Sequence, residues 1–471
     1  MFGFSARSIS NILFWVTRKK WLILAFLLSI SFFYFPSPEG LSPEGHRTLI
    51  IVGVALVLII SESIPLPAVA ILILVMEVIL GVDDADGVAS SFMSDAVFFI
   101  MGSLMLAVAL VNQGLDKRLA LTVINITGNK TWRIILGFVA ISALLSSFIG
   151  EHTVGAMMLP VVLALIRNAG LSTNKATKLS TLLLFSIAYG CAIGSIGTPS
   201  GGGRNVIMIG YISEFGMGTI SYLDWMKFAY PMLLIEIPIV ASILWYSFTP
   251  EQKIMDSSVR KLKVKVAKTG RLTANQKLAI VIFFFVFLGW IFLSPIVGLG
   301  IVALSGVFLY LSFGLIEWRE INRSTNWGVI LLFGSAISLG IQMKETGAAL
   351  WVAEQTLYYL NIILKDATIV RWFVSVIITG LLTNLLSSAG TVAVLGPIIL
   401  DMGGEPIVMG IMTSIASAFA YLTVVASPTC MIIHSTGLIK SSDYFKAGWK
   451  LFIISVLLLL IISTFYWPML L

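Results

Sequence analysis

An acid and a base stand side by side within an apolar part of the sequence. Glu151 and His152 lie in the polar run 146–160, which reads SSFIGEHTVGAMMLP and has apolar sequence on both sides. Ionisable side chains are costly to place inside a membrane, so a buried pair indicates a functional site. The alternative is an interfacial turn that leaves both side chains in the water between lipid headgroups. The cost of burial makes chemistry at this pair the first hypothesis.

A second charged group lies in a break rich in glycine. Residues 194–205 read GSIGTPSGGGRN, and Arg204 is the charged residue among them. Glycine and proline at this density unwind a helix, and unwound backbone at membrane depth persists only where it lines a cavity or is covered by protein. The planar guanidinium fork fits a carboxylate or a tetrahedral oxyanion with two hydrogen bonds. Alternatively, Arg204 forms a salt bridge to Glu151 that only joins the two stretches.

The composition places these residues in a membrane protein. The 471 residues are 58% hydrophobic and 11% charged, and the mean hydropathy is +1.00. A soluble globular chain of this length does not have such values. Apolar runs of about 20 residues predict spanning helices and not barrel strands. The net charge of +7 comes from basic residues between those runs, so we expect topology determinants and no nucleic-acid partner.

Other chemistries find little support in the sequence. Cys191 and Cys430 have neither a CxxC nor a Cys/His spacing, so neither a disulfide framework nor a zinc site is indicated. An intramembrane enzyme with Glu151 and His152 as acid and base would carry a motif such as HExxH or GxSG, and the sequence has none. We expect no enzyme and no prosthetic cofactor.

The elements that must position the polar residues follow from the apolar runs. We expect an all-α polytopic membrane protein with about 11 transmembrane helices and two re-entrant hairpins. Residues 131–167 are too polar at the middle for one span and have basic residues at both ends, which predicts a hairpin; residues 368–400 predict a second one. Two discontinuous helices are expected at 179–215 and 406–440. The continuous spans are expected near 21–35, 47–65, 66–81, 96–113, 228–249, 278–294, 297–316, 327–343 and 446–470.

Basic residues orient this arrangement. With the N-terminus in the cytoplasm and the C-terminus outside, most Lys and Arg fall on the cytoplasmic side, many of them in the linker 250–277. We expect a multi-pass protein of a bacterial or archaeal inner membrane. Glu62, Glu77 and Glu236 lie close to span ends, so we expect them to snorkel to the interface.

The two halves of the chain are similar in sequence. The run 99–103 before Gly114 resembles 331–335 before Gly347, and the run 150–160 matches 387–397 in its spacing to proline. Residues 426–428 correspond in the same way to residues 197–199. The expected topology runs the copies in opposite directions, so we predict an inverted repeat with a binding site at the midplane. The domains are then an N-terminal span and external loop (1–46), repeat 1 (47–249), the linker (250–277) and repeat 2 (278–471).

This order of motifs resembles the divalent anion/sodium symporter (DASS) family of dicarboxylate, citrate and sulfate transporters, over nearly the whole chain. In that family each hairpin tip carries Ser-Asn-Thr and each broken helix a Gly-Thr-Pro-x-Asn-like loop. Counted back from the prolines, the tips fall on Gly150-Glu151-His152 and on Ser387-Ser388-Ala389, and both depart from the family pattern. The first loop keeps its Gly-Thr-Pro and reaches an Asn only after a glycine run and Arg204. The second loop, residues 426–430, lacks the Asn.

The resemblance implies which residues form the site, because the tips and loops together hold the anion and its sodium ions. The implied substrate-binding residues are Glu151, His152, Thr153, Thr198, Pro199, Arg204, Ser388, Ala389, Gly390, Thr391, Ser427, Pro428 and Thr429. The implied cation-coupling residues are Ser146, Gly150, Glu151, Gly197, Asn205, Thr383, Ser387, Ser388 and Ala426. The only metal expected is Na+.

The coupling ion stays open at this point. Sodium prefers oxygen ligands, which the hydroxyls of hairpin two supply. At hairpin one, Glu151 could hold sodium more tightly or carry a proton, since carboxylate and imidazole chains form proton relays. Arg204 or a protonated His152 could instead neutralise the anion without a coupling ion, as in an exchanger.

The expected function is secondary active transport of a divalent organic anion, of the dicarboxylate or citrate class, coupled to sodium or protons. By resemblance, it would use an elevator-type alternating-access motion in a homodimer. The alternatives are an anion exchanger without sodium coupling, a sulfate-type transporter, and a cation/proton exchanger of a related fold.

Overall fold

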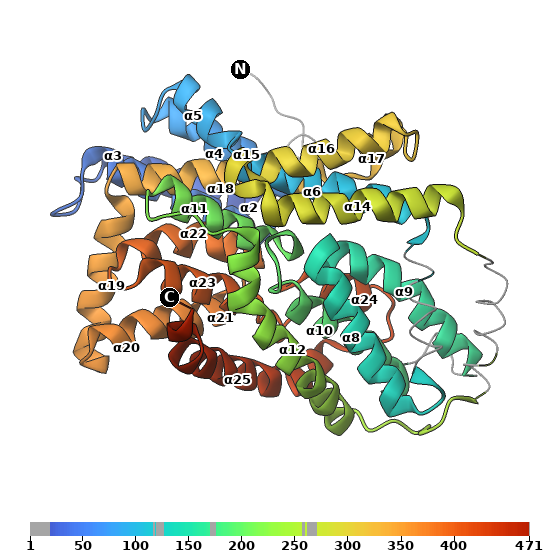
Figure 1. The fold of residues 1–471 in the computed structure, drawn as a ribbon. Coiled ribbons are helices and arrows are strands. Elements are labelled where there is room, and N and C mark those ends of the chain that lie inside the picture. Colours follow the sequence, from blue (N-terminus) through green and yellow to red (C-terminus); the bar gives the residue numbers. More distant parts are fainter. Residues whose placement is uncertain are drawn as a thin grey trace, which may run out of the picture.

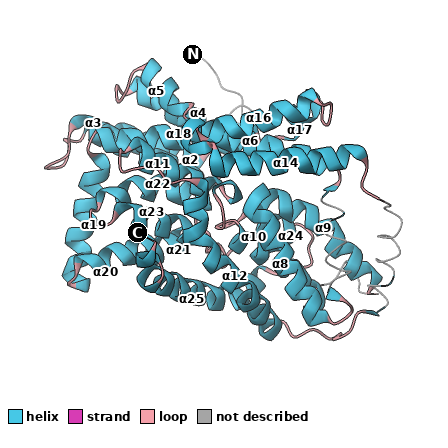
Figure 2. Ribbon diagram, viewed as in Figure 1, coloured by secondary structure: helices cyan, strands magenta, loops and turns pink. Residues whose placement is uncertain are grey.

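The computed structural model describes residues 19–115, 118, 127–169, 176–256, 260 and 271–470. Within these ranges the chain is helical, and its β-type pairing is limited to an isolated bridge between Lys130 and Ile254 (Figure 2). Residues 1–18 and most of the expected basic linker after residue 256 lie outside the described part. The described residues agree with the expected all-α class.

Several helices meet the requirements of a membrane crossing. Among the described residues, seven helices are long and apolar enough to span a membrane. These helices are Pro43–Ser61, Asp95–Asn112, Thr131–Ile149, Tyr222–Ser247, Ala274–Phe292, Trp327–Glu345 and Ser441–Met469. The chain is therefore a polytopic membrane protein, and the expected number of 11 crossings stays a prediction.

One group of helices lies in the upper part of Figure 1. Its members are α2 (Lys20–Tyr34), α3 (Pro43–Ser61), α4 (Leu66–Ile79), α6 (Asp95–Asn112), α14 (Ala274–Phe292), α16 (Leu299–Ser312) and α18 (Trp327–Glu345). Asp95, at the start of α6, accepts hydrogen bonds from the backbone N–H of Leu299 (2.9 Å) and Gly300 (3.0 Å), which satisfies orphan donors at the start of α16. Gly102 of α6 leaves room for the side chain of Ala303, so the two helices pack closely.

Three helices lie where no element was expected, namely α5 (Ala85–Phe92), α17 (Trp318–Ser324) and α19 (Ala348–Leu364). The short α15 (Ser294–Val297) lies at the junction of the expected spans 278–294 and 297–316. The 17-residue α19 is the largest omission, since the sequence analysis left residues 344–367 without an element. Polar residues such as Glu354 and Asn361 make this segment a poor spanning helix, so a search for apolar runs passes over it. The structure begins it after Gly347, whose φ of 75° only glycine adopts readily.

A second group contains both expected hairpins. Hairpin 1 consists of α8 (Thr131–Ile149) and α9 (Glu151–Asn168), which diverge from Gly150 (Figure 1). Gly150 has a φ of 81°, so glycine suits this turn. Hairpin 2 consists of α20 (Ala367–Trp372), the π-helical segment Phe373–Ile378, α21 (Thr379–Leu382) and, after a turn, α22 (Ser388–Asp401). Both agree with the expected segments to within a few residues.

Both discontinuous helices are also present. The first is α10 (Lys178–Gly194), a break with the short 3-10 helix η1 (Pro199–Gly201), and α11 (Gly203–Glu214). The second is α23 (Pro406–Ala416) followed by α24 (Pro428–His434). We call residues 195–202 loop 1 and residues 417–427 loop 2. The resumed helix α24 ends several residues before the expected end at 440.

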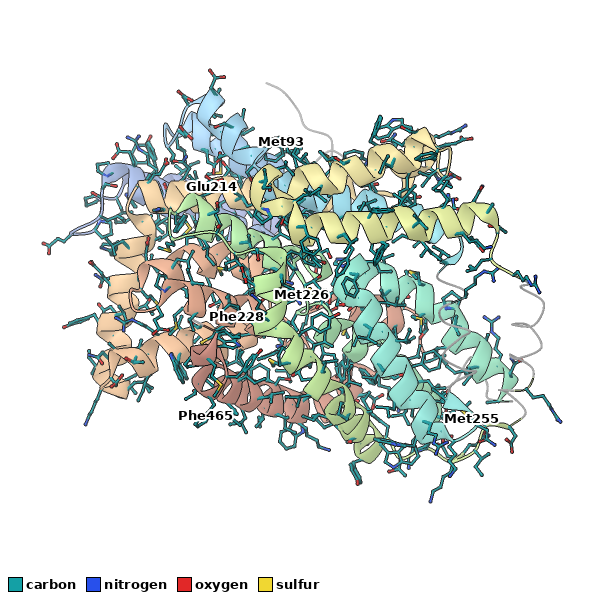
Figure 3. All side chains as sticks on the ribbon, in the orientation of Figure 1. Met93, Glu214, Met226, Phe228, Met255 and Phe465 are labelled. Atoms are coloured by element: carbon teal, nitrogen blue, oxygen red, sulfur yellow. The ribbon has the colours of Figure 1, made fainter. Side chains whose placement is uncertain are left out.

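Two long helices complete this group by packing against each other. α12 (Tyr222–Ser247) runs through the middle of the view, where Figure 3 labels Met226 and Phe228, and α25 (Ser441–Phe465) lies below it. Pro231 cannot donate to the carbonyl of Lys227, and the Tyr466 hydroxyl donates to that carbonyl instead (3.2 Å). The indole of Trp467, in η3 (Trp467–Met469), donates to the Phe228 carbonyl (3.1 Å).

The expectation for the three span-end glutamates is wrong in two cases. Glu62 is exposed, as expected. The side chains of Glu77 and Glu236 are 0% and 1% exposed, and each has one carboxylate oxygen without a hydrogen-bond partner. Packing of α18 over Glu77 and of α25 over Glu236 prevents either from reaching an interface.

Close packing between α10 and α8 yields a stability prediction. A Cβ on Gly194 would lie 2.2 Å from the Ala143 carbonyl oxygen and 2.4 Å from Ser146 Oγ. Because backbone must move to relieve that contact, we expect Gly194→Ala to destabilise the protein by about 1–3 kcal/mol. Thermal unfolding in detergent measures the effect. The control is Gly53→Ala in α3, where a Cβ meets nothing within 4 Å. Equal melting temperatures for the two variants would contradict this packing.

Candidate functional site

Hairpin 1 and loop 1 are joined through backbone carbonyls. Ser146 Oγ donates to the Cys191 carbonyl (2.7 Å), and Thr198 Oγ1 donates to the Ser147 carbonyl. The indole of Trp225 on α12 donates to the carbonyl of Ile196 (2.9 Å). The Thr198 and Trp225 bonds satisfy carbonyls at the end of α8 and in loop 1 that have no helical partner, so loop 1 is held in place at the hairpin tip.

Carbonyl oxygens converge at Gly201, a residue that the sequence analysis did not select. A Cβ on Gly201 would lie 2.8 Å from the Ser195 oxygen, 3.0 Å from the Ser147 oxygen and 3.2 Å from the Ser146 oxygen. A glycine is therefore needed where hairpin 1 meets loop 1. Each of these carbonyls accepts one hydrogen bond, from Asn205, Thr198 and the Gly150 N–H respectively, and keeps a second lone pair. Backbone carbonyls are oxygen donors that transporters use for sodium.

Asn205 fastens loop 1 from the start of α11. Its side-chain nitrogen donates to the carbonyls of Ser195 (2.9 Å) and Thr198 (2.8 Å), and its side-chain oxygen accepts from Ser414 Oγ (3.0 Å). Ser414 lies on α23, so this amide also joins the two broken helices. All of its polar atoms are engaged, which makes Asn205 a clamp in this conformation.

Hairpin 2 holds loop 2 in a similar way. Thr383 Oγ1 donates to the Ser417 carbonyl (2.7 Å). The Asn384 side chain donates to the carbonyls of Gly380 (2.7 Å) and Phe419 (2.9 Å). Its oxygen accepts from the backbone N–H of Leu422 (2.8 Å). The sequence analysis selected Thr383 and missed Asn384, although an amide next to a selected hydroxyl in an apolar segment was a usable signal.

The two halves of the chain meet at the tip of hairpin 1. Thr429 Oγ1, in the first turn of α24, donates to the backbone carbonyl of Glu151 (3.1 Å). Gly155 of α9 gives the Thr429 side chain its space, because a Cβ there would lie 2.5 Å from the threonine methyl group. Loop 2 ends in Ala426 and Ser427, both buried; Ser427 caps α24 by accepting from the Thr429 N–H (3.2 Å), and Pro428 is the first helical residue.

The charged residues of the site lie close enough to interact. Glu151 is 5% exposed at the start of α9, and Arg204 is 2% exposed near the start of α11. Both His152 and Arg204 are within electrostatic range of Glu151. His152 is exposed and Thr153 half-buried, so the tip presents both at its surface.

The hydrogen-bond donors of the Arg204 guanidinium are only partly used. Its Nη2 donates to Ser195 Oγ, and its Nε is buried without a hydrogen-bond partner. Of the described side chains, Lys227 and Asp224 form a salt bridge, and Arg204 and Glu151 do not. In this conformation Arg204 is therefore not held by a salt bridge to Glu151. A buried guanidinium with an unused donor is suited to an anion.

The tip of hairpin 2 is placed differently from that of hairpin 1. Ser387 caps α22 by accepting from the Gly390 N–H (3.2 Å), and Thr391 Oγ1 donates to the Ser387 carbonyl (3.1 Å). Ser388 is buried at the start of α22. Ala389 and Gly390 line a small apolar recess with residues of α3, α4 and α18. The predicted roles of these five residues stay predictions.

The remaining predicted residues lie in loop 1. Gly197, Thr198 and Pro199 are buried, and a Cβ on Gly197 would lie 2.6 Å from a Leu233 methyl group. An open cavity of about 520 Å³ is lined by Phe148 and Ile149 in the last turn of α8 and by apolar residues of α6 and α14. The tip is packed against loop 1 and α24, and this cavity lies next to it at Ile149.

Comparison with known proteins agrees with this arrangement. The family profile described as the sodium:sulfate symporter transmembrane region matches residues 16–471, nearly the whole chain. The chain belongs to this family. The DASS resemblance drawn from the hairpins and loops is thereby confirmed.

Curated relatives of this symporter family carry transporter names. The sodium-dependent high-affinity dicarboxylate transporter 3 of Caenorhabditis elegans is 26% identical over 418 residues, which are 79% of this chain and 74% of that protein. The sodium-dependent dicarboxylate transporter SdcS of Staphylococcus saprophyticus is 26% identical over 477 residues (95% and 91%). SdcS of Staphylococcus aureus strain USA300 is 28% identical over 474 residues (95% and 90%). The family and these relatives are transporters and not enzymes.

Proposed function

We propose that this membrane transporter carries a divalent organic anion of the dicarboxylate class by secondary active transport coupled to sodium. The observation that carries the proposal is Arg204, buried beside the hairpin tip with an unpartnered Nε. A guanidinium in a site of low polarity binds a carboxylate strongly and with defined geometry. Relatives named as dicarboxylate transporters support the same substrate class.

The cation would bind beside the anion, where hairpin 1 meets loop 1. The oxygens around Gly201 belong to Ser146, Ser147 and Ser195, and Glu151 adds a carboxylate at the tip. Oxygen ligands of this kind suit sodium, and a sodium ion there would reduce repulsion between Glu151 and an incoming anion. This differs from the family tip, where an amide takes the position of Glu151, and it leaves a proton as the second coupling ion to test.

The moving unit would consist of both hairpins, both broken helices, α12 and α25. The upper helices of Figure 1, from α2 to α18, would form the scaffold. The open cavity between hairpin 1 and the scaffold helices α6 and α14 reaches Ile149, next to the tip, which supports access from that side. By the positive-inside rule that side is cytoplasmic, with the N-terminus inside and the C-terminus outside a bacterial or archaeal inner membrane.

The halves form an inverted repeat, and the working unit is a homodimer.

A second candidate, an anion exchanger without a coupling ion, is favoured by one observation. Arg204 has no ion-pair partner among the described residues, so its charge is available to neutralise part of a dianion. Fixed positive charge of this kind removes the need for a sodium ion.

Uptake into proteoliposomes separates the candidates. The purified protein is reconstituted and labelled succinate, citrate and sulfate are offered with and without an inward sodium gradient, at two pH values. We expect succinate uptake that depends on the sodium gradient. Uptake that needs only an internal anion would establish the exchanger, and uptake of sulfate without either organic anion would overturn the substrate class.

Glu151 decides which cation drives uptake. We expect Glu151→Gln to keep the fold, because its main-chain bond to Thr429 is retained, and to lower the apparent sodium affinity about tenfold through loss of a charged oxygen ligand. The measurement is the sodium dependence of succinate uptake at pH 6 and pH 8. The exposed Glu214→Gln serves as the control. A variant that loses pH dependence while its sodium dependence is unchanged would assign the proton to Glu151 instead.

A further inference from the structure

A buried carboxylate outside the proposed anion site has an unusual environment. Glu236 lies on α12 between Pro231 and Pro238 and is 1% exposed. Its Oε1 accepts a hydrogen bond from Ser455 Oγ on α25, and its Oε2 has no partner. A carboxylate that accepts one hydrogen bond from a neutral donor in an apolar interior offsets only a small part of its free energy of desolvation. The environment therefore favours the neutral acid.

The neighbouring groups connect this position to loop 2. The Tyr421 side chain is within electrostatic range of Glu236, and its hydroxyl is buried without a hydrogen-bond partner. Arg204 and Glu151 also act electrostatically on Tyr421. Tyr189 of α10 donates to the Tyr421 carbonyl (2.9 Å), which fixes this part of loop 2. A tyrosine of loop 2 thus stands between the candidate anion site and the buried acid.

The described charged side chains on the helices that pack against Glu236 do not neutralise the charge of its carboxylate. Within the described part of the chain, Glu236 forms no salt bridge, and Ser455 is its side-chain hydrogen-bond donor. Lys450, also on α25, bonds to Ser247 Oγ (3.1 Å). Sodium would require more oxygens than one carboxylate and two hydroxyls supply. A proton fits this site, and a metal cation does not.

We infer that Glu236 is a proton-binding site: it holds a proton in this conformation and releases it when loop 2 and the packing of α25 against α12 change during transport. Two atoms without a hydrogen-bond partner define the exit: Glu236 Oε2 would carry and donate the proton, and Tyr421 Oη would accept it while passing on its own hydroxyl proton. Protonation of Glu236 then favours the packed arrangement seen here. The release step rests on the proposed transport cycle, whereas the bound proton does not.

Infrared spectroscopy tests the bound proton without any transport. The wild-type protein in lipid is expected to show a C=O absorption of a protonated carboxyl group that Glu236→Gln removes. Ser455→Ala should shift this absorption to higher frequency, because the carbonyl loses its donor. Ser463→Ala, on the same helix with a hydroxyl bonded to the Leu460 carbonyl (3.1 Å), should leave it unchanged. If Glu236→Gln and Ser455→Ala both leave the wild-type spectrum unaltered, the inference is overturned.

The pH profile of labelled succinate uptake tests the release. Wild-type uptake should fall on the alkaline side by at most about tenfold per pH unit, the limit for one proton. Glu236→Gln, which cannot ionise, should lose that dependence. Glu77→Gln is the matched control, since Glu77 is equally buried with one serine partner (Ser338 Oγ, 2.8 Å) but lies on α4. Coincident profiles for Glu236→Gln and the wild type overturn the release step. Absence of succinate uptake by the wild type would instead count against the proposed function, and the infrared result would then decide the proton site alone.

Discussion

Replacement of Arg204 by Gln is expected to lower succinate uptake about 100-fold or more at low substrate concentration. The guanidinium is 2% exposed and has an unpartnered Nε at the hairpin tip. Removing one partner of a buried charge pair costs about 2–5 kcal/mol. A loss of about 3 kcal/mol in binding free energy corresponds to the expected decrease of about 100-fold in uptake. The measurement is the initial rate of uptake into proteoliposomes, with expression and thermal stability recorded for each variant.

Two further variants make the Arg204 result specific. Arg204→Lys keeps the charge but not the planar fork, so we expect an intermediate rate with a weakened apparent affinity for the dianion. Arg319→Gln removes an exposed arginine of α17 and should transport as the wild type does. Uptake by Arg204→Gln within threefold of the wild-type rate would show that Arg204 only supports loop 1 through Ser195.

The breaks in the helices were predictable because their cause is local. Gly150 turns the chain between α8 and α9 with a φ of 81°. Pro199 begins the short 3-10 helix inside loop 1, and Pro428 begins α24 directly after loop 2. Such residues act on their own backbone wherever the chain places them. For this reason both hairpins and both broken helices could be located from the sequence to within a few residues.

The burial of single side chains was not predictable in the same way. Glu236 lies in the middle of α12 and not near a span end, whereas Glu77 stands near the end of α4, where a long side chain normally reaches water. Whether it does depends on the neighbouring helix, and Ser338 of α18 and Ser455 of α25 come from positions more than 200 residues further along the chain. The pattern of one helix contains no information about that partner.

The same distinction between local and distant causes applies to the residues of the candidate site. The polar residues of hairpin 1 and loop 1 stood out because they interrupt apolar sequence, and the structure brings Glu151 and Arg204 within electrostatic range. Their partners did not stand out. Ser414 looks like any serine in a helix, yet it bonds to the Asn205 oxygen (3.0 Å) and joins the two broken helices. Contacts between the halves require the fold.

Asn384→Asp is expected to abolish transport and to destabilise the protein. The Asn384 side chain donates to the carbonyls of Gly380 and Phe419, and a carboxylate of the same shape has no hydrogen to donate. Leaving a buried hydrogen-bonding group without its partner costs about 1–3 kcal/mol, so two such losses cost about 2–6 kcal/mol. Thermal unfolding and succinate uptake measure the two effects. Asn361→Asp, on the exposed surface of α19, is the matched control.

This substitution also separates two roles that an asparagine at a hairpin tip could have. If Asn384 were a sodium ligand, an aspartate would be a stronger oxygen donor and sodium would be bound more tightly. The Asn384 oxygen already accepts from the Leu422 N–H (2.8 Å), and its nitrogen holds loop 2 through Phe419. The clamp therefore predicts loss of both stability and uptake. An Asn384→Asp protein that folds normally and responds to lower sodium concentrations would contradict the clamp and make Asn384 a cation ligand.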